Sequence, residues 1–575
     1  MKGAHMSAII GIDLGTSTTE AAIYRDGKPE LILNFLQQVV TPSAVGIDDA
    51  GNWIAGERAR AQYLLSPERT AIEIKRAIGT NRTFLIGKKG YSPAELSAKI
   101  LEYVRAYAAE YLGETIERAV ISVPAYFNDT QRQETLKAGM LSGLRVERII
   151  NEPTAAALSY GLDHMEEESH ILVYDLGGGT FDVTLLEMFE GVLEVKASSG
   201  DNQLGGKDFD ERLIKHFCDE FVKQHGIDPQ NEITAMARLK NEAENCKKAL
   251  SESESYRAVL PNLMKKGNAP AGLDITVSRE EFEVMTADLL KRSHAPIDSV
   301  LYDSGLTKDE INCVILVGGS TRMPMVEKDI EEYLHVPVRK AVDPDFAVAQ
   351  GAAIQGAIMT GEISPDEGLI MTDVNPYSLG VRTAEGFAND YMSIVIPRNT
   401  TIPALREQIY STCGDYQTEA EIEVYQGESS SVFDNSFLGR FTVGGIPPKK
   451  AGKEKIRVGF SYDMNGILSV KATIVSTGEQ GSIDIDMNNA DVETKPQIDY
   501  EKWKEVPGAS KYRSVIRKAE KLLDKIDRAQ DPEVYDALEM AVRNIKSSII
   551  LEDEAFIKEC EELLRTTIRI IEKEI

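Results

Sequence analysis

The pattern of apolar and polar residues changes twice along the chain. Over residues 6–361, short apolar runs that end at Gly, Pro or Asp alternate with segments of helical periodicity. Buried strands separated by helices indicate an α/β domain. The predicted strands are Ala8–Ile12, Ala119–Val123, Ile171–Tyr174 and Cys313–Val317, and two of the predicted helices are Pro93–Tyr111 and Glu232–Ser251.

A polar, turn-rich segment, Glu362–Gly368, and an apolar tag, Leu369–Met371, end this domain. We predict an interdomain linker over 362–373. Beyond it the apolar period falls to two, as in the run Ile456–Tyr462, and Asn465-Gly466 is a preferred hairpin turn. The pattern predicts an antiparallel β domain over 374–490.

After residue 490 the apolar period becomes 3.6, which indicates amphipathic helices over 491–575. A small three-helix bundle is expected. A dimerising coiled coil stays open, although breaks at Asp531-Pro532 and Glu552–Glu554 keep each apolar seam short. At the other end, Met1–His5 resemble a tag remnant, with Met6 as the natural start.

Composition narrows the function classes. The 575 residues carry 64 Lys+Arg and 92 Asp+Glu, a net charge of −28, which disfavours nucleic acid as the main partner. A 42% hydrophobic and 27% charged composition is typical of globular domains. Five scattered cysteines without a C-x-x-C pair indicate a reducing, cytoplasmic compartment. No apolar stretch reaches the roughly 18–20 residues that span a bilayer.

Three glycine-rich turns follow predicted strands: Asp13–Thr19, Asp175–Asp182 and Gly318–Arg322. Glycine lets backbone approach a phosphate, Thr and Ser supply short donors, and Asp can hold a hydrated Mg²⁺. One such turn alone is usually a plain hairpin. Two distant Asp-Leu-Gly turns suggest a duplicated fold whose halves offer phosphate-binding hairpins to one nucleoside triphosphate.

These turns resemble those of the actin-like ATPases, and the segments between them resemble the DnaK-type chaperones of the 70 kDa heat-shock family. The resemblance covers nearly all of residues 7–490. It implies a multidomain chain with a duplicated α/β actin-like ATPase domain, an antiparallel β-sandwich peptide-binding domain and a short α-helical lid. The segments that carry it are Val123–Asp129, Gln131–Gln133, Asn151–Ala157, Leu204–Asp210, Arg398–Pro403 and Tyr425–Glu428.

The resemblance assigns a nucleotide site for ATP and Mg²⁺, with K⁺ as a further candidate. From pattern alone, Lys75 would be an exposed helix lysine. The implied catalytic residues are Asp13, Lys75, Glu152, Asp175 and Thr180, and Asp13, Asp175 and Asp182 would hold the metal, largely through water. The implied nucleotide-binding residues are Gly15, Thr16, Ser17, Thr18, Gly177, Gly178, Gly179, Gly205, Gly206, Glu244, Lys247, Lys248, Ser251, Gly318, Gly319, Ser320, Arg322 and Asp345.

The resemblance also implies a peptide pocket and a relay between domains. Ordinary sandwich core is the alternative interpretation of the pocket positions, and the small side chains of Ala384 and Ala420 imply a wide pocket. The pocket set is Leu379, Val381, Ala384, Tyr410, Cys413, Ala420, Ile422 and Ile467, and the relay set is Pro124, Arg132, Leu369, Ile370 and Met371.

The implied function is an ATP-dependent chaperone that binds extended apolar segments of unfolded proteins. A J-domain co-chaperone is the expected partner, and the exchange factor and the choice between monomer and transient dimer stay open. The short stretch between Gly79 and Tyr91 and the short helical tail most resemble the compact bacterial HscC branch. A small-molecule kinase on the same duplicated fold and a peptide-binding regulator with little turnover are the alternatives.

Overall fold

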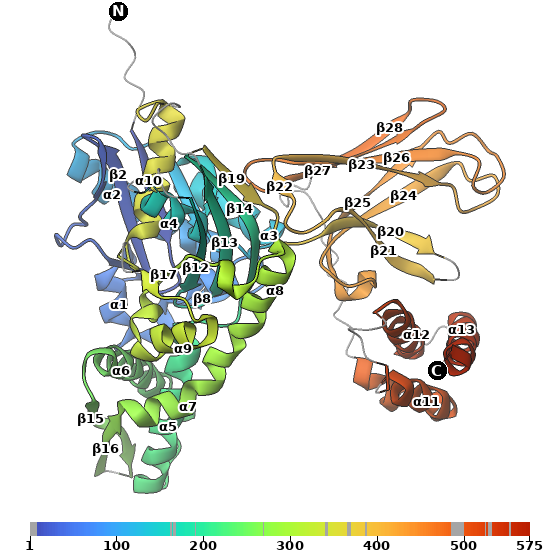
Figure 1. Cartoon of the computed structure of the whole chain (residues 1–575). Coiled ribbons are helices and arrows are strands. Elements are labelled where there is room, and N and C mark those ends of the chain that lie inside the picture. Colours follow the sequence, from blue (N-terminus) through green and yellow to red (C-terminus); the bar gives the residue numbers. More distant parts are fainter. Residues whose placement is uncertain are drawn as a thin grey trace, which may run out of the picture. The chain divides into compact units, whose positions relative to one another are not determined.

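The chain forms two compact units (Figure 1). The computed structural model describes residues 8–161, 164, 168–189, 191–267, 269–339, 343–364, 370–385, 388–484, 500–523, 525–526, 532–550 and 554–574. The first unit comprises Met1–Pro376, Arg398–Ala404 and Tyr462–Leu468, and the second comprises Tyr377–Pro397, Leu405–Ser461 and Ser469–Ile575.

Two large sheets of the first unit share one topology. The first has the order β11-β10-β1-β2-β3, and the second begins β18-β17-β12-β13-β14. In each, an antiparallel hairpin (β1–β2 or β12–β13) lies beside a strand that pairs in parallel with its first member (β10 or β17). The strands are β1 (Ile9–Leu14), β2 (Thr18–Arg25), β3 (Lys28–Leu31), β10 (Arg118–Val123), β11 (Arg145–Asn151), β12 (Ser169–Leu176), β13 (Phe181–Phe189), β14 (Val192–Asp201), β17 (Cys313–Val317) and β18 (Val338–Arg339).

Helices α4 (Glu152–Gly161) and α10 (Ala347–Thr360) pack against each other, and α10 also packs on β1 and β2. Small residues permit this close approach. A Cβ on Gly351 would lie 1.7 Å from the Ala155 carbonyl oxygen, and one on Gly11 would lie 2.2 Å from the Ala353 nitrogen. The alanine-rich sequence of both helices is therefore a packing requirement.

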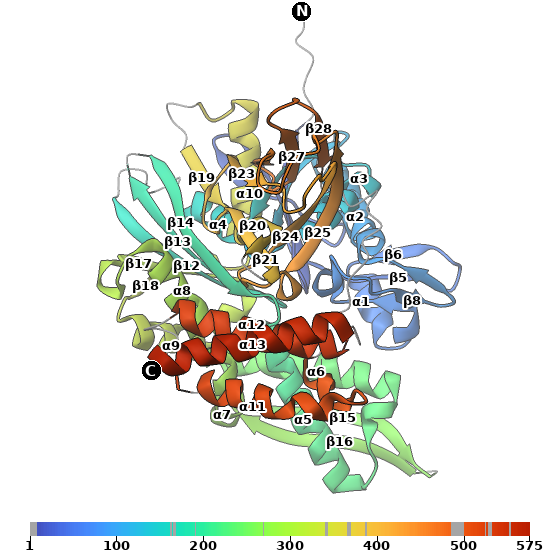
Figure 2. The same ribbon diagram turned by 90° about the vertical axis from the view of Figure 1, so that its right-hand side faces the viewer.

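The remaining elements of the first unit surround these sheets. Helices α5 and α6 contact each other and the β15–β16 hairpin (Figure 2). These elements are β4 (Thr41–Pro42), β5 (Val45–Ile47), β6 (Trp53–Ala55), α1 (Glu57–Tyr63), β7 (Thr70–Ala71), β8 (Phe84–Ile86), β9 (Lys89–Tyr91), α2 (Pro93–Leu112), α3 (Asp129–Leu141), α5 (Gly206–His225), α6 (Ile233–Glu252), β15 (Ser255–Lys266), β16 (Ala269–Ser278), α7 (Arg279–Arg292), α8 (His294–Ser304) and α9 (Pro324–Leu334).

The second sheet continues past β14 through β19 (Ile370–Val374) to β22 (Thr401–Ile402). Strand β19 pairs in parallel with β14, with Met371 opposite Leu193. Residues 370–373, which the sequence pattern places in the linker, are thus an added strand of this sheet. Leu369 lies outside the described residues.

The second unit contains two four-stranded sheets and a cluster of helices. The sheets have the orders β21-β20-β24-β25 and β23-β26-β27-β28, and the Asn465-Gly466 turn joins β26 to β27 as predicted. The strands are β20 (Leu379–Glu385), β21 (Ala388–Ile396), β23 (Ala404–Ser411), β24 (Glu419–Gln426), β25 (Ser436–Gly444), β26 (Lys455–Tyr462), β27 (Leu468–Ile474) and β28 (Gln480–Asp484).

Helices α11 (Arg513–Leu523), α12 (Pro532–Ile550) and α13 (Glu554–Glu574) bury a common apolar core that includes Ile516 and Leu564. The three predicted helical stripes therefore pack together. Across the described parts of the chain, no helix combines the length and the apolar character needed to cross a bilayer.

The contact between α4 and α10 predicts a strong local effect. Gly351→Ala places a methyl group against rigid backbone and should destabilise the first unit by about 2 kcal/mol or more. Met359→Ala on the same helix removes a side chain that is 42% exposed and should change stability by about 0.5 kcal/mol or less. The denaturant midpoint of the first unit measures both, and equal midpoints would contradict the packing argument.

Candidate functional site

A cavity of about 580 Å³ in the first unit is lined by all three glycine-rich turns. The β1–β2 turn, the β12–β13 turn and η5 (Gly319–Arg322) each contribute residues. The sequence therefore predicted correctly that these distant segments converge. The predicted residues that line the cavity are Asp13, Gly15, Thr16, Ser17, Thr18, Lys75, Glu152, Asp175, Gly177, Gly178, Thr180, Glu244, Lys247, Lys248, Ser251, Gly318, Gly319, Ser320, Arg322 and Asp345.

The two Asp-Leu-Gly turns approach each other closely. A Cβ on Gly178 would lie 2.6 Å from Ser17 Oγ, and one on Gly179 would lie 2.8 Å from Thr16 Oγ1. Behind the second turn, the amide of Gly206 donates to the Gly177 carbonyl at 2.9 Å. Glycine at these positions thus lets two hydroxyl-bearing turns face one cavity.

Gly179, Gly205 and Gly206 are not among the residues that line the cavity. A Cβ on Gly205 would lie 2.6 Å from Gly179 Cα, so these two glycines pack backbone against backbone. The Gly206 carbonyl accepts a hydrogen bond from Lys247 Nζ at 2.9 Å. These residues support the second turn from behind.

Lys75 lies on η2 (Ile74–Ala77) and is buried, with 6% exposure, rather than exposed as its pattern alone suggested. Its ammonium forms a hydrogen-bonded ion pair with Glu152 at the start of α4. Burial alone would lower the pKa of Lys75, but the carboxylates of Glu152, Asp13 and Asp175 raise it. The lysine therefore remains a cation inside the cavity.

Three carboxylates lie close to this ammonium or to one another. The Asp13 carboxylate accepts a hydrogen bond from Ser122 Oγ at 2.8 Å, and burial raises the pKa of Asp13. Asp175 is 4% exposed, and burial, followed by the charge of Glu152, raises its pKa well above the usual range. Burial raises the pKa of Asp182 to about 7.

This donor set fits a hydrated metal ion. Oδ1 of Asp182 accepts from the Tyr126 amide at 2.8 Å, whereas its buried Oδ2 has no hydrogen-bond partner within the described residues. Also within those residues, no group of three or more His, Cys, Asp or Glu side chains could hold a metal directly. Asp13, Asp175 and Asp182 would therefore hold Mg²⁺ mainly through water.

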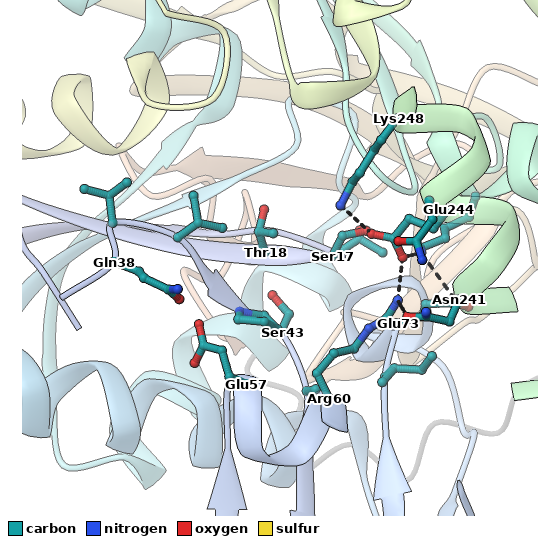
Figure 3. A pocket seen from close by; sticks show the side chains of 18 of the residues that line it. Ser17, Thr18, Gln38, Ser43, Glu57, Arg60, Glu73, Asn241, Glu244 and Lys248 are labelled. Carbon is teal, nitrogen blue, oxygen red and sulfur yellow. Dashed lines mark hydrogen bonds and ion pairs between the residues drawn. The ribbon is translucent and has the colours of Figure 1, made fainter. Parts of the chain in front are cut away.

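A second cavity of about 640 Å³ adjoins the first and shares Thr16, Ser17, Thr18, Glu244 and Lys248 with it (Figure 3). Glu244 on α6 pairs with Arg60 on α1 at 2.6 Å and with Lys207 at 3.2 Å. Burial alone would raise the pKa of Glu244, but Lys207 and Arg60 lower it strongly. Glu244 is thus an ionised acceptor facing both cavities.

Other charged residues that the sequence assigns to nucleotide binding differ in environment. The Lys247 ammonium pairs with Asp210 at 2.8 Å, and Lys248 is 68% exposed and pairs with Glu244 at 2.8 Å. Arg322 contacts Asp345 at 2.6 Å on the far wall. These positions contribute paired charges to the lining of the cavity.

The predicted relay residues Pro124 and Arg132 are both buried, and Arg132 is connected to β19. Arg132 donates to Ala125 O at 3.1 Å and to Asn151 Oδ1 at 2.6 Å, and Asn151 Nδ2 donates to the Asp373 carboxylate at 2.8 Å. Asp182, which does not itself line the cavity, accepts from the amide of Tyr126, the residue after Ala125. Hydrogen bonds and the peptide bond between Ala125 and Tyr126 therefore connect Asp182 to β19.

Two further relay positions lie on β19. The Met371 side chain packs on the apolar core beneath the sheet, whereas Ile370 is 60% exposed. Leu369, the remaining relay position, lies outside the described residues. Met371 is therefore the described residue of the apolar tag whose side chain fixes β19 to the apolar core.

Seven of the predicted peptide-binding residues belong to the second unit. Leu379 and Val381 on β20 are buried, Ala384 and Cys413 are exposed, and Tyr410, Ala420 and Ile422 are half-buried. Ile467 differs, because it lies in Tyr462–Leu468 and so belongs to the first unit. The grouping of these eight positions into one peptide pocket stays a prediction.

Sequence reasoning missed several residues of the first cavity. Glu20 on β2 is 3% exposed, and its pKa is raised well above the usual range by burial and then by Asp13. A single acidic residue inside an apolar strand that follows a phosphate turn could have identified it. The other missed lining residues are Val40, Glu252, Val317, Met323, Pro344 and Val348.

Comparison with protein-family models gives one match over nearly the whole chain. The model described as "Hsp70 protein" matches residues 9–86 and 82–575. The matched ranges include every residue that lines the first cavity.

The Asp182 carboxyl predicts a pH dependence of stability in the metal-free and nucleotide-free protein. Its pKa is raised from 3.8 to about 7, so its stabilising contribution is complete below about pH 3.8 and is lost as pH rises through 7. This loss of unfolding free energy amounts to up to roughly 4 kcal/mol, and Asp182→Asn should abolish it. Denaturant unfolding between pH 4 and 8 measures this pH dependence. If the unfolding free energy of the variant fell with pH as steeply as that of wild type, the role given to Asp182 would be contradicted.

Proposed function

The chain belongs to the Hsp70 family of ATP-dependent chaperones, and we propose that ATP hydrolysis in its first unit controls how tightly its second unit holds extended apolar segments of unfolded proteins. One observation carries the proposal. A buried lysine and a set of carboxylates share one cavity with two facing glycine-rich turns.

The residues of the cavity have complementary parts in this reaction. The backbone and hydroxyls of the two turns bind the phosphates, and the Lys75 ammonium orients the attacking water and stabilises charge that develops on the γ-phosphate. Asp13, Asp175 and Asp182 position the metal's water shell. Bound Mg²⁺ supplies charge neutralisation between the phosphates.

The hydrogen-bonded path from Asp182 to Asp373 supports coupling between nucleotide and peptide. Arg132 and Asn151 connect the segment beside the cavity to β19, and the chain continues from β19 into the second unit. A nucleotide that stabilises the pairing of β19 with β14 must bind that state more tightly, and peptide must then affect nucleotide reciprocally.

The expected partners and setting complete the proposal. The clients are extended apolar segments, held on β20, β24 and the residues around Tyr410 by strand-like hydrogen bonds and apolar contacts. A cytoplasmic J-domain protein stimulates hydrolysis. The β8–β9 hairpin, which fills the short stretch after Gly79, and the three-helix tail support the compact HscC-like branch.

Removing the buried ammonium tests the catalytic assignment. Lys75→Ala should lower the single-turnover rate of ATP hydrolysis about 10²–10³-fold, because charge on the transferred phosphoryl group loses its stabilising cation. ATP affinity, measured by calorimetry, should change less than tenfold and verifies the fold. Lys223→Ala, at a lysine that is 70% exposed, should match wild type. A rate within threefold of wild type for Lys75→Ala would contradict the assignment.

The coupling path is tested on β19. In wild type, MgATP should accelerate release of a fluorescent extended apolar peptide, followed by anisotropy. Met371→Asp places a charge in the apolar core and should abolish the acceleration while leaving affinity without ATP unchanged. Ile370→Asp changes the exposed neighbouring residue and should retain most of the acceleration by MgATP. Equal acceleration in all three proteins would refute the role of β19.

A further inference from the structure

The Glu20 side chain is a buried carboxylate in the first cavity for which neither catalysis nor packing has yet provided a role. It is 3% exposed and lines the cavity beside Thr16, Ser17 and Thr18. Within the described residues Glu20 forms no ion pair, and its hydrogen-bond partner is the Thr18 side chain. A buried carboxylate without a cation costs several kcal/mol, so its presence requires a reason.

The register of the β1–β2 hairpin places Glu20 opposite Asp13. Directly opposed residues of antiparallel strands point to the same face with Cβ atoms about 4.5–5.5 Å apart, and like charges there repel. Both side chains line the same cavity. The hairpin thus directs two carboxylates at the space that the phosphates and their metal would share.

Lys75 attracts both carboxyl groups of this pair, but its hydrogen bond is made elsewhere. Its ammonium is hydrogen-bonded to Glu152, which is itself a buried carboxylate. Asp175 and Asp182 add further buried carboxyl groups nearby. Lys247 pairs with Asp210 and Arg322 with Asp345, so these cations of the cavity lining are already engaged. Among the described residues, the cavity therefore holds more buried acidic side chains than it holds cations without another partner.

We propose that Glu20 is a further metal-positioning residue, which holds the water shell of the nucleotide-bound divalent cation together with Asp13. The inference rests on the proposed nucleotide site and adds a carboxylate from β2 to it. A water-mediated role agrees with the described residues, among which no group of three or more His, Cys, Asp or Glu side chains could hold a metal directly. The bound cation then compensates the repulsion between the opposed side chains.

Mn²⁺ binding in the presence of saturating ADP tests the role apart from turnover, with free Mn²⁺ followed by electron paramagnetic resonance. Glu20→Gln keeps shape and hydrogen bonding but removes the charge, and should weaken Mn²⁺ binding about tenfold or more. Glu20→Asp keeps the charge and should stay within about threefold of wild type. Glu30→Gln on β3, whose carboxylate pairs with Arg25, should bind Mn²⁺ as wild type does.

A second readout separates metal positioning from a structural role. Without metal and nucleotide, Glu20→Gln should leave the thermal midpoint close to that of wild type, because an amide of the same shape replaces a buried carboxyl group, whereas a purely structural role of the carboxyl would lower the midpoint. Unchanged Mn²⁺ affinity in Glu20→Gln, or equal weakening in Glu20→Asp, overturns the Glu20 assignment and leaves the nucleotide site intact. A wild-type protein whose Mn²⁺ binding ignores ADP overturns the proposed function itself.

Discussion

The buried ammonium of Lys75 is the interaction on which the cavity depends. It joins η2 to α4 through Glu152 and attracts Asp13 on β1 and Asp175 on β12, so one positive charge connects elements of both large sheets. Replacing it with a neutral group would leave several buried carboxylates uncompensated, which costs more than the lost ion pair. The cation that we propose for catalysis is thus also the charge that connects the two sheets.

The stability of the cavity therefore depends on how its buried carboxylates are compensated. Glycine contacts fix the backbone of the two turns within van der Waals distance, while the carboxylates around them repel one another. Rigid donors and unneutralised acceptors together favour a ligand that carries both phosphate oxygens and a cation. Binding and positioning follow from the same arrangement of charge, with little rearrangement of backbone needed.

The sequence predicted the strands and the helices, because these follow from the spacing of apolar residues. It also predicted the convergence of the glycine-rich turns, because two of them repeat one motif far apart in the chain. The burial of Lys75 and the cavity position of Glu20 depend on which elements pack around them, and the pattern of one strand or helix does not contain that information. Residues 370–373 illustrate the same limit. Their sequence alone predicts a linker, because it does not show that β14 pairs with them.

The parallel pairing of β19 with β14 has a consequence for how a signal could travel. Strands can pair only at whole-residue steps, and a slip of one residue would turn Met371 out of the apolar core and carry Asp373 away from Asn151. No intermediate register satisfies both contacts. The pairing of β19 with β14 is therefore either present in this register or lost. If the cavity controls this pairing as we propose, a graded change there would alter the fraction of molecules in which the two strands are paired.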